Sequence, residues 1–354
     1  MKVLIFSVAG PGDADLSQVA ALNIIQSNPL IDITFTIINN SGNQIIPKYP
    51  SVNNIIIKNG IPNNNQYSPS VHHAMAINSF LATLAQSQYD YYLLIDPDVI
   101  QIQTNAITSI IKKMRCEDID VYSFPWHLKW YSKYRSRTSP HFFFFSRYTL
   151  HQNILNFSPL LDDKSFLSLI PIFLYRLKSR VLNSSVNSVK DSSHLPQESD
   201  KNSSTTFILK ILSSFFITRF AINSAKDTGY KNSYQYLSSK GIKVEIGKMF
   251  ISMKSLSNIF HLRVKFLEII ERHLLYKRIS FAPRSSEYIY TAKYDSLSIK
   301  TKTEIFSIDG KNISFVHLRK FTHDFRTYDI EKIKAIFVTG LLSDTLDKSE
   351  QNSY

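Results

Sequence analysis

The sequence predicts an α/β fold built around a mostly parallel sheet. Short apolar runs of strand length alternate with segments of helical spacing through residues 1–125. Polar or glycine-rich segments follow these runs, as at Gly10-Pro11-Gly12 and Asn39-Asn40. The 354 residues are 44% hydrophobic, which is enough for a sizeable core in one large domain with an insertion or in two smaller domains.

In the first half, strands and helices are expected to alternate along the chain. Residues 15–27 place Leu16, Val19 and Ile24 at helical spacing, and residues 70–86 form a similar pattern. The predicted strands are residues 3–8, 33–38, 54–57, 91–95 and 121–124, and a third helix is predicted at residues 107–114. Strands that alternate with helices form βαβ units, so ligands should bind beyond the carboxyl ends of parallel strands.

The second half is less regular. Strands are predicted at residues 141–146 and 243–246, and helices at residues 262–276 and in the segment that ends at Lys240. Residues 160–222 have the composition of an insertion, with apolar ends around a polar centre that we expect to be a flexible loop. A helix and a polar tail are expected at residues 331–354.

The chain is strongly basic. Its 41 Lys and Arg against 28 Asp and Glu give a net charge of +13. Such a charge attracts the phosphates of nucleic acids, anionic lipids and nucleotides, although it can also serve solubility alone. The basic and aromatic residues 126–137 could stack on sugar rings, lie at a membrane surface, bind single-stranded nucleic acid or form an ordinary surface.

The single cysteine and the short apolar runs constrain the location of the protein. Cys116 alone cannot form an internal disulfide or a cysteine-based zinc site, and we expect a buried thiol in a reducing compartment. Residues 3–8 are too short for a signal-peptide core, and residues 166–175 fall well short of the ~20 residues of a spanning helix. We therefore expect a cytoplasmic protein whose contact with the inner face of the membrane is at most peripheral.

Asp96-Pro97-Asp98 is the strongest chemical signal in the sequence. The motif directly follows the apolar strand predicted at residues 91–95. Alternate residues of an extended segment project to the same side, so both carboxylates could bind one hard cation, Mn²⁺ or Mg²⁺, that also binds diphosphate oxygens. Asp and Pro are also common turn residues, so an ordinary turn is the alternative.

Several segments resemble bacterial glycosyltransferases of the GT-A fold, in particular those similar to family 2. The resembling segments are residues 70–78, 89–98, 140–147, 227–230 and 316–319. The resemblance implies a Rossmann-like, mostly parallel sheet with a smaller antiparallel sheet on the acceptor side. It implies one GT-A domain over residues 1–330, with a sugar-nucleotide-binding half at residues 1–125 and an acceptor half, interrupted by the insertion, at residues 126–330.

The same resemblance implies a metal-dependent transfer of sugar from a nucleotide-sugar donor to a hydroxyl of a glycan or lipid-linked acceptor. It places this step in the synthesis of surface polysaccharide or lipopolysaccharide, with no nucleic-acid partner. Asp96, Asp98 and His317 would hold Mn²⁺ or Mg²⁺, and Arg319 would neutralise the departing nucleotide. Asp227 would take the proton of the acceptor hydroxyl, which favours inversion, although an Asp before a helix is often an N-cap.

The remaining expected contacts belong to the donor. Its base and ribose should lie at the loops after the first three strands, and Asn78 would face its sugar or brace the metal loop. These candidate donor-binding residues, which include one of the two metal-binding carboxylates, are Ala9, Gly10, Asp13, Asn39, Lys58, Asn59, Asn78, Asp96 and Arg319. For Asn78 the alternative is a place on the helix surface. For His317 the alternatives are binding of the leaving diphosphate and a structural role.

Two other functions compete with glycosyl transfer. A sugar nucleotidyltransferase would have basic residues in the glycine-rich loop after its first strand, but no Lys or Arg lies between Lys2 and Lys48. A non-catalytic basic protein that binds nucleic acid or anionic membrane is the second alternative. Its binding would be sensitive to salt and would survive loss of Asp96 and Asp98.

Overall fold

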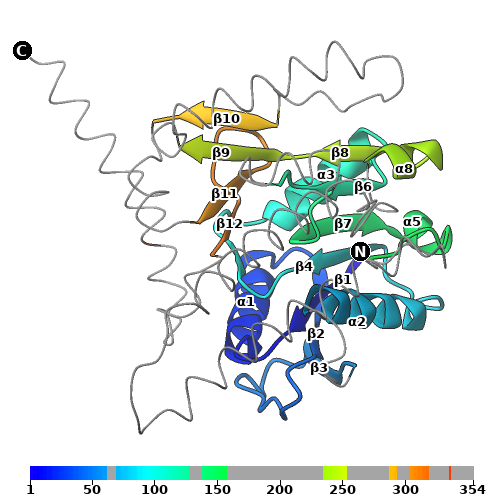
Figure 1. Ribbon diagram of the computed structural model, residues 1–354. Coiled ribbons are helices and arrows are strands. Elements are labelled where there is room, and N and C mark those ends of the chain that lie inside the picture. The colour runs from blue at the N-terminus through cyan, green and yellow to red at the C-terminus, as the bar shows by residue number, and fades with distance from the viewer. Residues whose placement is uncertain are drawn as a thin grey trace, which may run out of the picture.

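We describe the chain from a computed structural model. The description covers residues 1–61, 69–126, 138–157, 234–252, 287–292, 303–318 and 335. Within these residues the strands form two sheets, of seven and five strands (Figure 1).

The main sheet has the order β3-β2-β1-β4-β7-β6-β8. Its strands are β1 (Lys2–Ala9), β2 (Asp32–Asn39), β3 (Ile55–Asn59), β4 (Tyr91–Ile95), β6 (Val121–Ser123), β7 (Phe142–Ser146) and β8 (Val244–Ile246). The first four strands of the chain run parallel to one another. Strand β7 is antiparallel to both β4 and β6, and β8 is parallel to β6. The carboxyl ends of β1 to β4 therefore meet at one edge.

Helices cover both faces of this sheet. They are α1 (Ala14–Ser27), α2 (Pro69–Thr83), α3 (Ala106–Cys116), α5 (Arg147–His151) and α8 (Tyr234–Ser239). Side chains of alternate residues in a strand point to opposite faces. Accordingly, Val3 and Ile5 pack in one core cluster with α1 and α3, whereas Leu4 and Phe6 pack in another with α2.

The second sheet has the order β10-β9-β11-β12-β5 and lies toward the top of Figure 1. Its strands are β5 (Val99–Gln101), β9 (Lys248–Ser252), β10 (Tyr288–Thr291), β11 (Glu304–Ser307) and β12 (Phe315–His317). All its pairs are antiparallel except β9 with β10. The small β5 comes from the first half of the chain, so the second sheet joins segments that lie far apart in sequence.

Within the described residues, the chain passes directly from the main sheet to the second sheet at two places. Asp96-Pro97-Asp98 connects β4 to β5, and Gly247 alone connects β8 to β9. A Cβ at residue 247 would lie 2.6 Å from the Phe124 ring and would also overlap the Tyr122 hydroxyl. Only glycine leaves room for the backbone there.

The structure confirms the predicted α/β fold with a mostly parallel main sheet and a smaller second sheet. The strand predicted at residues 54–57 instead covers Ile55–Asn59, because Lys58 and Asn59 continue to pair with β2. The prediction that Cys116 is buried is wrong, because α3 buries Ile107, Ile110 and Met114 and its last residue is exposed. Among the described helices, none has the length and apolarity needed to span a bilayer.

Candidate metal and donor site

Asp96 and Asp98 lie where the two sheets meet. Asp96 follows the last residue of β4, and Asp98 precedes the first residue of β5. Main-chain hydrogen bonds hold this link on both sides: the amide of Asp96 donates to the carbonyl of His141, and that of Leu318 donates to the carbonyl of Asp98. The two carboxylates therefore lie between the start of β7 and the end of β12.

His317 lies beside Asp98 because β12 pairs with β5. In this antiparallel register His317 is opposite Val99, and its Nε2 is 3.0 Å from Asp98 Oδ1 and 3.8 Å from Asp96 Oδ2. On its other side β12 pairs with β11, which places Glu304 opposite His317. The Nδ1–H of the imidazole donates to Glu304 Oε2 at 2.8 Å, and both side chains are almost fully buried.

His141 lies beside Asp96 because β7 is antiparallel to β4. Phe142 pairs with Ile95, so His141, which precedes Phe142, lies opposite Asp96, which follows Ile95. His141 Nδ1 is 2.5 Å from Asp96 Oδ2, and its ring centroid is 4.5 Å from that of His317. The Trp126 ring packs edge-on against His141 at 4.6 Å. This places two imidazoles beside the carboxylate of Asp96, and one of them, that of His317, also contacts Asp98.

The charges of this cluster shift its proton equilibria. Burial favours the neutral form of Asp96, but the charges of His141, His317 and His73 and the hydrogen bond from His141 hold its pKa below the ordinary value. Burial also acts to lower the pKa of His317, but Asp98 and Glu304 together raise it to about 10. His317 is therefore an imidazolium in this state, with its two N–H groups directed at Asp98 and Glu304.

The ligand atoms of these side chains fit a divalent cation. One ligand atom each from Asp96, His141 and His317 lies within 4.8 Å of the others, and Asp98 is in contact with His317. Carboxylate oxygens and imidazole nitrogens are the usual ligands of such ions. The bond from Glu304 to the far nitrogen of His317 is the arrangement that commonly orients a metal-binding histidine.

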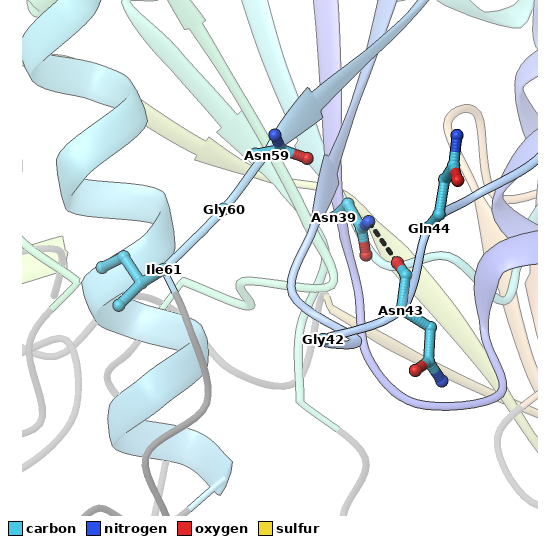
Figure 2. A pocket seen from close by; sticks show the side chains of 7 residues that line it. All are labelled: Asn39, Gly42, Asn43, Gln44, Asn59, Gly60 and Ile61. Carbon is cyan, nitrogen blue, oxygen red and sulfur yellow. Dashed lines mark hydrogen bonds between the residues drawn. The ribbon is translucent and has the colours of Figure 1, made fainter.

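A pocket lies at the same edge of the main sheet, beyond β2 and β3 (Figure 2). Its volume is about 570 Å³, and no charged side chain lines it. The residues that line it are Asn39, Gly42, Asn43, Gln44, Asn59, Gly60 and Ile61. In Figure 2 the side-chain Nδ2 of Asn39 donates to the main-chain carbonyl of Asn43 at 2.7 Å, and this bond shapes the loop after β2.

A buried hydrogen-bond network connects this pocket to helix α2. The Nδ2 of Asn40 donates to His72 Nδ1 at 2.9 Å, and His72 Nε2–H donates to the carbonyl of Ile61 at 2.8 Å. Asn40 Oδ1 also accepts from the amide of Ile61 at 2.9 Å. His73, the next residue of α2, is close enough to Asp96 and His141 to interact with their charges, although burial is the main cause that lowers its pKa.

The structure places the other predicted donor-binding residues in different ways. Ala9 is buried at the end of β1, and Gly10 donates its amide to Asp13 Oδ2 at 3.2 Å, which closes the turn before α1. Lys58 extends over the ring of Phe80 on α2 at 5.4 Å. Asn78 binds Asn156 and the amide of Phe157, so its side chain holds the segment after α5.

Some predicted residues lie outside the described part of the chain. These are Asp227, Arg319, the insertion, the helix predicted at residues 262–276, the C-terminal segment apart from residue 335, and all of the basic aromatic stretch except Trp126. Arg147, which belongs to the segment 140–147 of the resemblance, is described but lies at the opposite end of β4. It binds the carbonyls of Gln88 and Tyr89 and the carboxylate of Asp90, because antiparallel pairing carries it away from Asp96.

Sequence reasoning missed His141, Glu304 and His73 as residues of this site. His141 was predicted only as the start of a strand, and its proximity to Asp96 depends on an antiparallel partner that βαβ periodicity does not reveal. Glu304 occupies the position in β11 directly opposite His317. A hairpin prediction for residues 304–317, centred on Asp309-Gly310, could have found this pair.

No family model matches this sequence, and no curated protein matches it. Among solved structures, galactosyltransferase LgtC with donor and acceptor sugar analogues is 10% identical, with 96% of each chain covered and a TM-score of 0.40. The mannosyltransferase PcManGT from Pyrobaculum calidifontis was solved with GDP-Man and Mn²⁺. It is 9% identical over 78% of this chain and 81% of its own, with a TM-score of 0.34.

A third similar structure is a fragment, residues 1–349, of TarS from S. aureus. It is 14% identical over 49% of this chain, with a TM-score of 0.33, and the match spans 56% of that fragment. Similarity this low does not assign an activity. The function of the site must be argued from its own residues.

Proposed function

We propose that this chain is a metal-dependent glycosyltransferase that moves a sugar from a nucleotide-sugar donor to a hydroxyl of a glycan or lipid-linked acceptor. One observation carries the proposal: Asp96, Asp98 and His317 converge at the carboxyl edge of a parallel sheet, with Glu304 behind the histidine. A bound divalent cation would neutralise the diphosphate of the donor and so stabilise it as a leaving group.

The amide-lined pocket supports the same proposal, as a site for the base and ribose of the donor. Strand β1 separates β2 from β4, so the end of β2 lies about 10 Å from the end of β4 at normal strand spacing. An extended nucleoside diphosphate can bridge that span. Asn39 and Asn59, both predicted to contact the donor, line this pocket.

The transfer itself is a substitution at the anomeric carbon. The acceptor oxygen forms a bond to this carbon, the bond from the carbon to the diphosphate oxygen breaks, and the nucleoside diphosphate leaves with the electron pair. In our proposal Asp227 takes the proton of the acceptor hydroxyl, which gives inversion, and Arg319 neutralises the leaving group. The assignment of Asp227 and Arg319, and of a role in surface polysaccharide or lipopolysaccharide synthesis, comes from the resemblance.

A thermal-shift panel of nucleotide sugars, with and without Mn²⁺, tests this function. A ligand that binds only the folded state raises the melting temperature, and the rise increases with the ratio of its concentration to its Kd. We therefore expect one donor to stabilise the protein only when the metal is present. Asp96→Asn and Asp98→Asn should abolish this shift while the protein stays folded. Asp118→Asn, the same change at an exposed turn after α3, is the matched control.

Two outcomes would contradict the proposal. If no nucleotide sugar shifts the melting temperature at millimolar concentration, the chain is not a transferase of this kind. If nucleic acid or anionic vesicles bind in a salt-sensitive way and Asp96→Asn leaves that binding unchanged, the basic binding protein is the better description.

A further inference from the structure

His141 is in the right position to do more than pair with Asp96. It precedes β7, and its side chain is only 14% exposed. Its Nδ1 is 2.5 Å from Asp96 Oδ2, and within the described part of the chain its buried Nε2 has no hydrogen-bond partner. Nδ1 is thus the nitrogen that faces the carboxylate of Asp96.

The separations between the facing atoms are close to those between ligands of one ion. Metal–nitrogen and metal–oxygen bonds of about 2.1 Å place neighbouring ligand atoms about 3 to 3.5 Å apart. The measured separations are 2.5 Å from His141 to Asp96, 3.0 Å from His317 to Asp98 and 3.8 Å from His317 to Asp96. Small side-chain movements would bring Asp96, His141 and His317 to ligand distance around one ion, in place of the protons that now join them, and Asp98 contacts the same face of the cluster through His317.

We propose that His141 is a ligand of the same ion as Asp96, Asp98 and His317, so that the site selects first-row transition ions over Mg²⁺. This inference rests on the metal site of the proposed function and goes beyond it by naming a fourth ligand and a class of ion. Imidazole nitrogen is a good ligand for Co²⁺, Zn²⁺ and Fe²⁺, whereas Mg²⁺ prefers oxygen and gives up its water reluctantly. Two imidazoles at one site therefore favour the transition ions strongly.

The neighbours of His141 support a ligand over a mere hydrogen-bond donor. The rings of Trp126 and His317 both pack against the His141 ring, which restricts the orientation of this imidazole. His317 has a carboxylate behind it in Glu304, as metal-binding histidines usually do. The two rings face the carboxylates from β7 and β12, which belong to different sheets.

The direct test counts the nitrogen ligands of a bound ion in the unmodified protein. With ¹⁵N-labelled histidine and Mn²⁺ bound in the absence of nucleotide, pulsed electron paramagnetic resonance should detect two directly bound imidazoles. One imidazole would overturn the inference. This measurement needs no variant, so it does not depend on whether a substitution folds.

A competition titration with Co²⁺ and Mg²⁺ tests the selectivity. Removal of an outer-sphere partner typically lowers metal affinity about 10- to 100-fold, so loss of a true ligand in His141→Gln should lower Co²⁺ affinity by more than that. Mg²⁺ affinity should change little, and the preference for Co²⁺ should fall. His151→Gln, at an exposed histidine that ends α5, is the control and should leave both affinities unchanged.

The result separates this inference from the proposed function. Two bound imidazoles without any nucleotide-sugar binding would uphold the four-ligand site and remove the transferase. One imidazole together with metal-dependent donor binding would uphold the transferase and remove His141 as a ligand. An unchanged preference for Co²⁺ in a folded His141→Gln protein would also overturn the inference.

Discussion

Glu304 and His317 face each other across the pair β11–β12, with 2.8 Å between Oε2 and Nδ1. This contact fixes the imidazole so that only Nε2 faces Asp98 and Asp96. A carboxylate in this position also raises the basicity of the histidine as a ligand. Glu304 is therefore a positioning residue of the proposed metal site.

We expect Glu304→Gln to weaken binding of Mn²⁺ about 10- to 100-fold, because glutamine keeps the shape but loses the charge behind His317. Calorimetric titration of Mn²⁺ measures this directly. Glu117→Gln removes a carboxylate from an exposed pair with Lys113 and should leave the affinity unchanged. Equal affinities in all three proteins would show that Glu304 only packs the hairpin.

Binding of a cation should release a proton from His317. Burial acts to lower its pKa, but Asp98 and Glu304 raise it to about 10, so the metal-free site holds an imidazolium below that pH. An ion that binds Nε2 must displace the proton there, so its affinity should rise by up to about tenfold per pH unit between pH 6 and 9. Titration in two buffers of different ionisation enthalpy should give close to one proton released, and a heat that is the same in both buffers would contradict this.

Gly247→Ala should destabilise the protein through a clash. The new Cβ would overlap the Tyr122 hydroxyl and the Phe124 ring, and such overpacking costs about 1 to 3 kcal/mol of the free energy of unfolding. Urea denaturation measures the loss. Tyr122→Phe in the same protein should restore part of it, since the Tyr122 hydroxyl has no partner among the described residues.

Gly241→Ala separates the clash from backbone strain. Gly241 has φ of +78° and open space around it, so alanine there costs only the strain of the left-handed conformation, about 1 kcal/mol. Tyr122→Phe should not rescue that variant. If it rescues both variants equally, the close approach at Gly247 is not the cause.

Asp309 should make the hairpin β11–β12 sensitive to acid. Burial acts to raise its pKa, but hydrogen bonds from Asn312, Lys311 and Ser307 together outweigh this and lower it to about 2. Since this value lies below the ~3.9 of an unfolded aspartate, the stabilisation is complete above about pH 4 and is lost as the pH falls to 2. Asp309→Asn should flatten the pH dependence of the free energy of unfolding in that range, and an unchanged dependence would contradict the assignment.

The sequence predicted the parallel half of the fold well, because apolar strands and helices with regular spacing are local patterns. Tyr91-Tyr92-Leu93-Leu94-Ile95 forms the strand that was predicted, and Asp96 and Asp98 follow it at the sheet edge. The antiparallel half depends on pairings between distant segments. His141 meets Asp96 across 45 residues of sequence, and Gln101 meets Phe315 across more than 200.

The same difference between local patterns and distant contacts explains which parts of the candidate site could be predicted. His317 was named as a ligand from the resemblance, and the structure brings it to Asp98. The exposed Cys116 and the bracing role of Asn78 were not predictable from spacing alone, because each depends on which face of its helix meets the sheet or a returning loop. Loop contacts such as those of Asn78 with Asn156 leave no periodic signal.

Two consecutive residues of α2 serve different neighbours. His72 is bonded to the wall of the amide-lined pocket, and His73 interacts with the charge of Asp96. A helix is stiff over two residues, so α2 fixes the distance between the pocket beside His72 and the carboxylate beside His73. A molecule that occupies both the pocket and the site at Asp96 must therefore span one fixed distance. A substitution that tilts α2 would weaken its binding at both sites together.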